Sequence, residues 1–406
     1  MTKFTHTLSR RPLIFSQGSI SLVDAIESIA ARAVAEDLRK TPPQRILVVM
    51  TRRLGDVLLV TPLIRSIKQA WPGAALDVLV IEGTEGFLLG NPDVSQLITV
   101  TQRPGWRRHF SLVSRLLRRY DLAVSALPSD RAVLYAWLAG RVRIAPLNPV
   151  KGQRWKQRLL SAWVPFDNMD THTVRMNLRL AELLGIPPVG KVVVGREADD
   201  ETSLLQKLPA EWFARPYAVL HVYPKYNYKM WHATGWIALA QWLVGHGMRV
   251  ALTGSAAPDE MAYVSDVCRQ LPVAALNMSG QLSLAENACL VSRARLYIGP
   301  DTALTHMAAA LGVPTVALYG PSNPVKWSPW PKDCDLGSNP FGLHGTQQVG
   351  NVMLVQGAGR GDGSCVPCFE EGCERHVGSF SDCLQHLSPQ TVIAAAQTLL
   401  EEWPPP

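Results

Sequence analysis

Acidic, hydroxyl and imidazole side chains gather at one predicted strand-to-helix turn late in the chain. Asp301 and Thr302 directly follow a short apolar strand, in the run Ile298-Gly-Pro-Asp-Thr-Ala-Leu-Thr-His306. Asp and Thr favour helix starts because their side chains accept hydrogen bonds from free first-turn amides. The same amides, together with the positive end of the helix dipole, can hold a phosphate. We therefore predict an anion site here, with His306 on the same helix face as Thr302. An ordinary capped helix is the alternative.

A second turn of the same kind lies near the start of the chain. Residues 46–50 form a continuous apolar run, as a buried parallel strand should. Gly55 and Asp56 follow, before a helix that we predict over 57–71. Ligands of open α/β sheets bind at the carboxyl ends of the strands. Gly55 would allow close approach of a backbone or ligand, and Asp56 would place a carboxylate there, unless it only caps the helix.

Two further polar residues follow predicted strands in the second half of the chain. Lys229 comes after the strand 217–223, where a lysine can neutralise a departing diphosphate, although Lys225 is an alternative by spacing. Glu260 follows the turn at 253–255, and carboxylates commonly accept from ribose hydroxyls in α/β sites.

Two consecutive series of alternating strands and helices organise the chain. Its 406 residues suit two domains better than one. The strands are predicted at 46–50, 76–81, 97–100, 122–127 and 142–146, and then at 217–223, 249–253, 274–277, 295–298 and 315–319. This pattern predicts an α/β protein with two Rossmann-like doubly wound domains facing each other across a cleft. We place them at 45–195 and 204–406, with a polar linker at 196–203.

Residues 1–44 form an extension before the first predicted strand. They contain an amphipathic helical pattern, whose apolar stripe would be Leu22, Ile26, Ile29 and Ala33. The extension lacks the apolar core of a secretory signal, and no run in the chain approaches the ~18 apolar residues needed to span a bilayer. We therefore expect a cytoplasmic protein.

Positive charge is concentrated in one part of the first domain. Residues 101–160 contain thirteen Lys and Arg against two acids, although the net charge of the chain is only +7. Residues 106–120 are typical of a basic amphipathic helix, and 151–158 of a basic loop. Such segments suit an anionic membrane or a phosphorylated acceptor. A solvated face is the simpler alternative, and we do not expect nucleic acid because no binding module is recognisable.

Four of the seven cysteines lie within one segment, 365–383. Cys365, Cys368, Cys373 and Cys383 could close a structural tetrahedral metal site. We do not favour it, because the second pair lacks C-x2-C spacing.

Taken together, these segments resemble the ADP-heptose lipopolysaccharide heptosyltransferases of glycosyltransferase family 9. The resemblance covers about residues 45–400 and rests on the runs 46–62, 229–231, 252–255 and 298–314. The run Trp327-Ser-Pro-Trp330 also resembles the third heptosyltransferase of the inner core. Ala303 is a departure, since most of the family has Gly there, but its backbone amide is retained.

The resemblance implies a GT-B fold and inverting transfer of heptose from ADP-heptose to an anionic glycolipid, the lipopolysaccharide inner core, at the inner face of the inner membrane. It makes Asp56 the general base and Lys229 the phosphate-binding lysine. The substrate-binding residues would be Gly55, Glu260, Asp301, Thr302, Ala303, Thr305 and His306. It implies no metal or other cofactor in catalysis. The alternatives are another sugar donor, a protein acceptor or a non-catalytic nucleotide-sugar-binding protein. Oligomeric state is not indicated.

Overall fold

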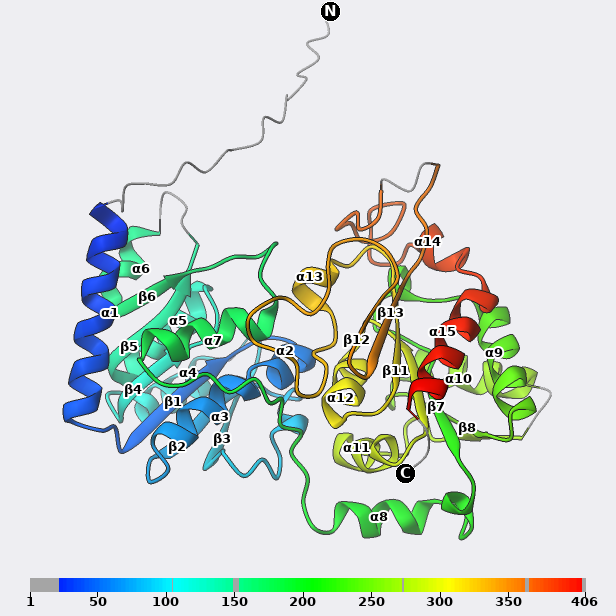
Figure 1. The fold of residues 1–406 in the computed structure, drawn as a ribbon. Helices are drawn as coiled ribbons and strands as arrows, with labels where there is room; N and C mark the ends of the chain where they lie inside the picture. Colours follow the sequence, from blue (N-terminus) through cyan, green and yellow to red (C-terminus); the bar gives the residue numbers. More distant parts are fainter. Residues whose placement is uncertain (1–21, 104, 149–152, 272–273, 362–364, 404–406) are drawn as a thin grey trace, which may run out of the picture.

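The first of two sheets lies in the amino-terminal half of the molecule (Figure 1). The computed structural model describes residues 22–103, 105–148, 153–271, 274–361 and 365–403. Six parallel strands run in the order β3-β2-β1-β4-β5-β6. Their bounds are β1 Arg45–Met50, β2 Ala75–Ile81, β3 Gln96–Val100, β4 Tyr120–Ser125, β5 Gly140–Leu147 and β6 Ala162–Pro165. This is the strand order of a Rossmann fold, with its switch point between β1 and β4.

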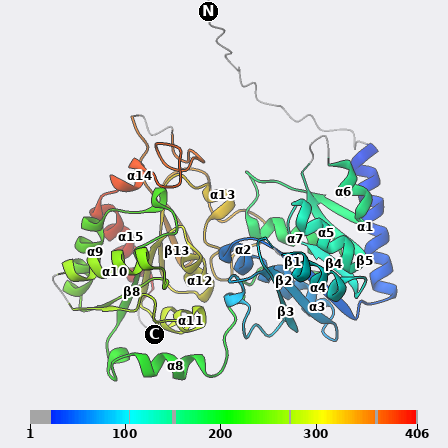
Figure 2. The same cartoon turned by 180° about the vertical axis from the view of Figure 1, so that it is seen from behind.

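Helices cover both faces of this sheet. α3 (Thr61–Ala70) packs on α7 (Thr173–Leu183), and α1 (Leu22–Lys40) lies against α7 and β6. On the opposite face, which Figure 2 turns toward the viewer, α5 (Asp130–Ala139) contacts both α4 (Trp106–Leu116) and α6 (Arg154–Leu159). The strands are apolar along their length because they are buried on both sides, as in β1, where 46–50 are all buried.

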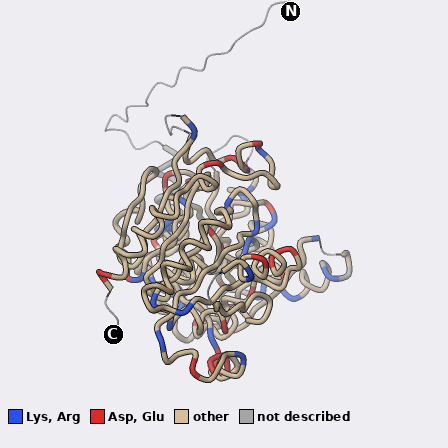
Figure 3. Tube along the Cα trace, turned by 90° about the vertical axis from the view of Figure 1, so that its right-hand side faces the viewer, with Lys and Arg blue, Asp and Glu red and all other residues tan. Residues whose placement is uncertain are grey.

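The second sheet repeats this plan. Its order is β12-β13-β11-β10-β7-β8-β9, parallel except for the β12/β13 pair. The bounds are β7 Tyr217–His221, β8 Arg249–Thr253, β9 Ala275–Asn277, β10 Leu296–Pro300, β11 Thr315–Tyr319, β12 Gln347–Val349 and β13 Val352–Gln356. The helices are α9 Ala233–Gly245, α10 Pro258–Gln270, α11 Leu284–Ser292, α12 Ala303–Leu311, α13 Pro324–Trp327, α14 Asp382–Gln385 and α15 Pro389–Glu402. The charged positions along the chain are marked in Figure 3.

An apolar cluster joins the two halves. Leu58 and Leu59 of α2 (Leu54–Leu59), with Phe87, belong to the same buried cluster as Met307 of α12 and Trp330. Burying apolar surface between the sheets therefore holds α2 and α12 together. That contact brings the carboxyl edges of the two sheets to one place.

Several local expectations were wrong. The helix predicted over 57–71 is two helices, α2 and α3, which meet at Val60, because Pro62 cannot continue a helix from the preceding turn. Gly55 and Asp56 lie inside the first turn of α2 instead of in the loop before it. A helix, α8 (Asp200–Lys207), begins within the predicted linker at 196–203, whose role as a linker stays a prediction.

The extension before β1 contains the expected helix, but its buried face differs. Among the described side chains of α1, the buried ones are Val34 and Leu38, whereas Ile29 and Ala33 of the predicted stripe are exposed, Ile29 by 67%; the side chains of Leu22 and Ile26 lie outside the described ones. Residues 1–21 lie outside the described part of the chain. None of the described helices combines the length and apolar character needed to cross a membrane.

Candidate functional site

Lys229 and Asp301 form an ion pair at the carboxyl edge of the second sheet. Lys229 ends the short 3-10 helix η3 (Asn227–Lys229) after β7, and Asp301 follows the neighbouring strand β10. Lys229 Nζ contacts Asp301 Oδ2 and also donates to the Asp301 carbonyl oxygen at 3.3 Å. Lys225, the alternative by spacing, is exposed, and its Nζ lies 5.9 Å from the Tyr226 ring centroid. The structure therefore places Lys229 beside the start of α12.

Asp301 holds this corner of the site together. Its carboxylate also accepts from Ser322 Oγ at 2.7 Å and from the Tyr319 hydroxyl at 3.3 Å. Burial alone would raise the pKa of Asp301, but Lys229 outweighs burial and the pKa lies below its ordinary value. Asp301 is therefore ionised and fixes the position of the Lys229 ammonium group, which has three N–H donors to share.

The first turn of α12 leaves its amides available. Thr302 is the N-cap residue, but its side chain makes no capping hydrogen bond; its hydroxyl lies 3.2 Å from Thr305 Oγ1. The Thr305 hydroxyl is fully buried and donates to the Pro300 carbonyl at 2.5 Å, so Thr305 can offer a ligand only its backbone. The alternative of an ordinary capped helix is therefore not supported at Thr302, and the free amides with the helix dipole remain to bind an anion, as predicted.

His306 presents an unsatisfied nitrogen at the same helix start. Its Nε2 lies 3.8 Å from Asp301 Oδ1, and its buried Nδ1 has no hydrogen-bond partner among the described residues. Burial lowers the pKa of His306 to about 4, although Asp301 opposes the shift. The imidazole is therefore neutral near pH 7, with one nitrogen left for a ligand.

Asp56 is a buried carboxylate on the facing sheet. Burial raises the pKa of Asp56, while Arg52 and Arg53 act to lower it. Arg52 Nη1 lies 3.7 Å from Asp56 Oδ1. Arg53, not Asp56, is the N-cap residue of α2. A carboxylate whose proton affinity is raised by burial suits a general base.

The two helix starts meet at Gly55. A Cβ placed on Gly55 would lie 3.6 Å from His306 Cδ2 and 3.9 Å from the Ala303 Cα. The chain on either side of Gly55 therefore packs against the first turn of α12, with the Ala303 methyl group directed at it. This contact brings the Asp56 helix to the anion site.

Glu260 lies at the same carboxyl edge of the second sheet, after strand β8. It lies in the first turn of α10, is buried, and accepts a hydrogen bond from Ser255 Oγ. A Cβ on Gly254 would come within 3.0 Å of Glu260 Oε1, so Gly254 leaves the space that the carboxylate occupies. Because β8 pairs with β7 and β7 with β10, Glu260, Lys229 and Asp301 share one edge of the sheet.

A cavity of about 670 Å3 opens at the carboxyl edge of the first sheet, and Arg52, which pairs with Asp56, lies in its wall. Polar side chains dominate its lining, which includes Thr51, Arg52, Ser129, Asp130, Asn148, Gln153, Lys156 and Asn168. Such a lining suits a hydroxylated, anionic molecule better than an apolar one.

Sequence reasoning missed several residues that complete the site. The Arg53 guanidinium lies 5.0 Å from the ring centroid of Tyr226, which stacks on Tyr228. Buried Lys326 donates to the Asp167 carbonyl at 2.7 Å, across the two halves. Burial lowers the pKa of Lys326 to about 8, and Asp167 opposes the shift. Arg52 and Arg53 lie in a recognised segment, but only the fold shows what they contact.

The cysteine segment lies away from these residues in sequence. Cys365, Cys368, Cys373 and Cys383 are free thiols. Backbone N–H groups of Arg360 and Asp382 donate to the sulfurs of Cys365 and Cys373 at 3.2 and 3.3 Å. Within the described ranges, no group of three or more His, Cys, Asp or Glu is placed to hold a metal ion.

Known proteins share both the sequence pattern and the fold. The family model for glycosyltransferase family 9 (heptosyltransferase) matches residues 109–347. A lipopolysaccharide heptosyltransferase 3 of Escherichia coli is 27% identical over 68% of this chain and 83% of its own length. A lipopolysaccharide heptosyltransferase 1 of Pseudomonas aeruginosa is 28% identical over 88% and 98%.

Solved structures agree on the fold. The E. coli ADP-heptose lipopolysaccharide heptosyltransferase II superposes with a TM-score of 0.65 and 21% identity, over 88% of this chain and 99% of that one. A family 9 glycosyltransferase of Veillonella parvula gives a TM-score of 0.69 and 19% identity, over 89% and 98%. Two Rossmann-like sheets with a site between their carboxyl edges define a GT-B glycosyltransferase. The chain belongs to glycosyltransferase family 9, the heptosyltransferase family.

Proposed function

We propose that this protein transfers heptose from ADP-heptose, with inversion at the anomeric carbon, to a hydroxyl of an anionic glycolipid in the lipopolysaccharide inner core. The curated relatives named above are lipopolysaccharide heptosyltransferases, which supports this donor and acceptor class. The observation that carries the proposal is the contact of Gly55 with Ala303 and His306. This contact places the helix that carries the buried Asp56 carboxylate against the first turn of α12, the proposed anion site.

Asp56 acts as the general base in this proposal. Its carboxylate accepts the proton of the acceptor hydroxyl while that oxygen forms a bond to the anomeric carbon. The bond between the anomeric carbon and the phosphate oxygen breaks, and its electron pair leaves with ADP. Attack from the face opposite the leaving group inverts the configuration. Arg52 favours the ionised form of Asp56 that this step requires.

Lys229 and the first turn of α12 stabilise the leaving diphosphate. Asp301 neutralises part of the lysine charge but also fixes its position, so the ammonium group is preorganised. The amides of Ala303 and its neighbours supply further donors, and His306 adds one when its single ring proton lies on Nδ1. Glu260 would accept from the ribose hydroxyls. Cation and amides together supply the neutralisation that other transferases obtain from a divalent metal, so we propose a metal-independent reaction.

The polar cavity lined by Arg52, the partner of Asp56, receives the acceptor in this proposal. Arg52 at its wall suits a carboxylate or phosphate on the acceptor sugar. The enzyme would act in the cytoplasm at the inner face of the inner membrane, where such a glycolipid displays its sugars. We assign no nucleic-acid partner.

A comparison of nucleotides tests the donor. ADP binds only the folded protein and should raise its melting temperature, by mass action, more than UDP or GDP at equal concentration. A larger shift with UDP or GDP would identify another sugar donor. Binding of ADP-heptose without turnover on any lipid or protein acceptor would instead indicate a nucleotide-sugar-binding protein.

A further inference from the structure

Helix α4 has a second apolar stripe that does not face the core. The side of α4 that faces the core carries the buried residues Leu112 and Leu116. A different face of the same helix carries Trp106, Phe110, Val113 and Leu117, whose spacing of four, three and four residues aligns them. Trp106 is 76% exposed, Phe110 72% and Leu117 53%. Large apolar side chains arranged in line on the outside of a helix are typical of an interaction surface.

The neighbouring helices extend this surface. Of the twelve tryptophans in the chain, those more than a third exposed are Trp106 on α4, Trp137 on α5 at 43% and Trp155 on α6 at 38%. The three helices lie side by side on one face of the first sheet (Figure 2), and α5 contacts both of the others. We call this the α4–α6 face. Exposed tryptophan is enriched where proteins meet the interface of a bilayer, because one end of the ring is apolar and the other polar.

Positive charge accompanies the aromatic side chains. Residues 101–160 contain thirteen Lys and Arg and only Asp121 and Asp130 as acids. Both acids have other partners: Asp121 accepts from the backbone of Gln44 and Arg45, and Asp130, whose side chain is 70% exposed, pairs with Lys156 at 2.6 Å. The exposed arginines of α4 and the loop after it, Arg108, Arg115, Arg118 and Arg119, therefore meet solvent without local acids of this segment to neutralise them.

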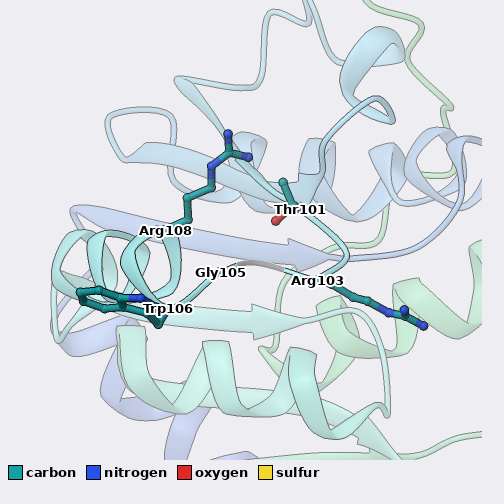
Figure 4. Close-up of a pocket in the computed structure, with 5 residues that line it drawn as sticks. All are labelled: Thr101, Arg103, Gly105, Trp106 and Arg108. Atoms are coloured by element: carbon teal, nitrogen blue, oxygen red, sulfur yellow. The ribbon is translucent and has the colours of Figure 1, made fainter.

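A shallow cavity opens at the start of α4. Its volume is about 320 Å3, and Thr101, Arg103, Gly105, Trp106 and Arg108 line it. Figure 4 shows the Arg103 and Arg108 side chains extending in different directions from the turn at Gly105, with the Trp106 ring beside it. Because the two arginines diverge, each guanidinium can contact a separate phosphate at the level of lipid headgroups.

We infer that the α4–α6 face docks on an anionic lipid bilayer, with Trp106, Phe110, Val113 and Leu117 in the boundary between headgroups and acyl chains and the arginines on lipid phosphates. The polar cavity that Arg52 lines is also lined by Ser129, Asp130, Gln153 and Lys156, which lie at or near the starts of α5 and α6. Docking this face therefore brings the membrane to the side of the molecule where the proposed acceptor enters. The inference rests on the proposed function only for that acceptor, because bilayer binding is measurable without turnover.

Flotation of the full chain with lipid vesicles tests the inference. The parent protein should float with vesicles of phosphatidylethanolamine and phosphatidylglycerol and remain behind with phosphatidylcholine alone. Trp106→Ser with Phe110→Ser should weaken binding to the anionic vesicles roughly tenfold or more. Arg115→Ser with Arg119→Ser should weaken binding and reduce its dependence on salt. Leu205→Ser with Met261→Ser removes exposed apolar side chains from the second half and should leave binding unchanged.

Two readouts separate docking from other effects. The Trp106→Ser, Phe110→Ser variant should keep the parent melting temperature and its turnover on a water-soluble acceptor without acyl chains. Parent protein that ignores anionic vesicles, or stripe and control variants that bind equally well, would overturn the inference. Salt-sensitive binding to duplex DNA in place of vesicles would also overturn it and would reassign the arginines to nucleic acid.

Discussion

The contact between Arg52 and Asp56 predicts how turnover should depend on pH. Asp56 must be ionised to accept a proton, so the rate should fall as pH drops through its pKa. Burial raises that pKa, and Arg52 opposes the rise. Arg52→Gln keeps a polar side chain but removes the charge. Because a nearby cation favours the carboxylate form, its removal should raise the pKa of Asp56 and move the acid limb of the profile to higher pH.

The geometry sets the size of the shift. Arg52 Nη1 lies 3.7 Å from Asp56 Oδ1, and the arginine side chain is 47% exposed. Two unit charges near this distance attract by about 1 kcal/mol in water and by about 4 kcal/mol at an effective dielectric constant of about 20. Screening of the half-exposed arginine favours the lower part of this range. Since one pKa unit corresponds to about 1.36 kcal/mol, the limb should move by about one unit.

The assay is the pH profile of kcat/KM, which reports the free enzyme. Loss of an acceptor contact by Arg52 would lower the whole profile without moving its midpoint. Arg45→Gln is a matched control: Arg45 is 48% exposed and its Nη2 lies 3.6 Å from buried Asp77, but it stands at the opposite end of β1. The control should keep the parent midpoint. An unchanged midpoint in Arg52→Gln would refute Asp56 as the titrating base.

Three other changes test the remaining roles. Asp56→Asn should lower turnover by about a hundredfold or more with little effect on ADP affinity; near-parent turnover in the folded variant would mean that the base is another acid. Lys229→Ala should weaken both ADP binding and turnover, whereas Lys225→Ala, in the same loop, should change neither. The melting temperature of the Lys229→Ala variant must also be measured, because this change leaves Asp301 without its cation. Chelation of divalent metal should leave turnover intact, and reversible loss of activity would contradict the metal-independent mechanism.

The strands that carry the site were predictable because their signals are local. Buried parallel strands are continuous apolar runs, and the predicted strands at 249–253 and 315–319 coincide with β8 and β11. Strands β6, β12 and β13 were not predicted. They are short or follow irregular segments, and their position depends on pairing with distant strands. The predicted apolar stripe of α1 was wrong at Ile29 and Ala33, because the partners that decide which face is buried, β6 and α7, lie far away in sequence.

For the site, the sequence by itself determined which chemical groups follow which strands. It placed a carboxylate after β1, a lysine after β7 and a helix start after β10, because such turns have short-range residue preferences. Only the tertiary structure decided what those groups contact. Asp301 does not cap its helix but binds Lys229, and Arg52 lies against Asp56. These pairings depend on the two sheets burying a common apolar cluster between them, which no local pattern records.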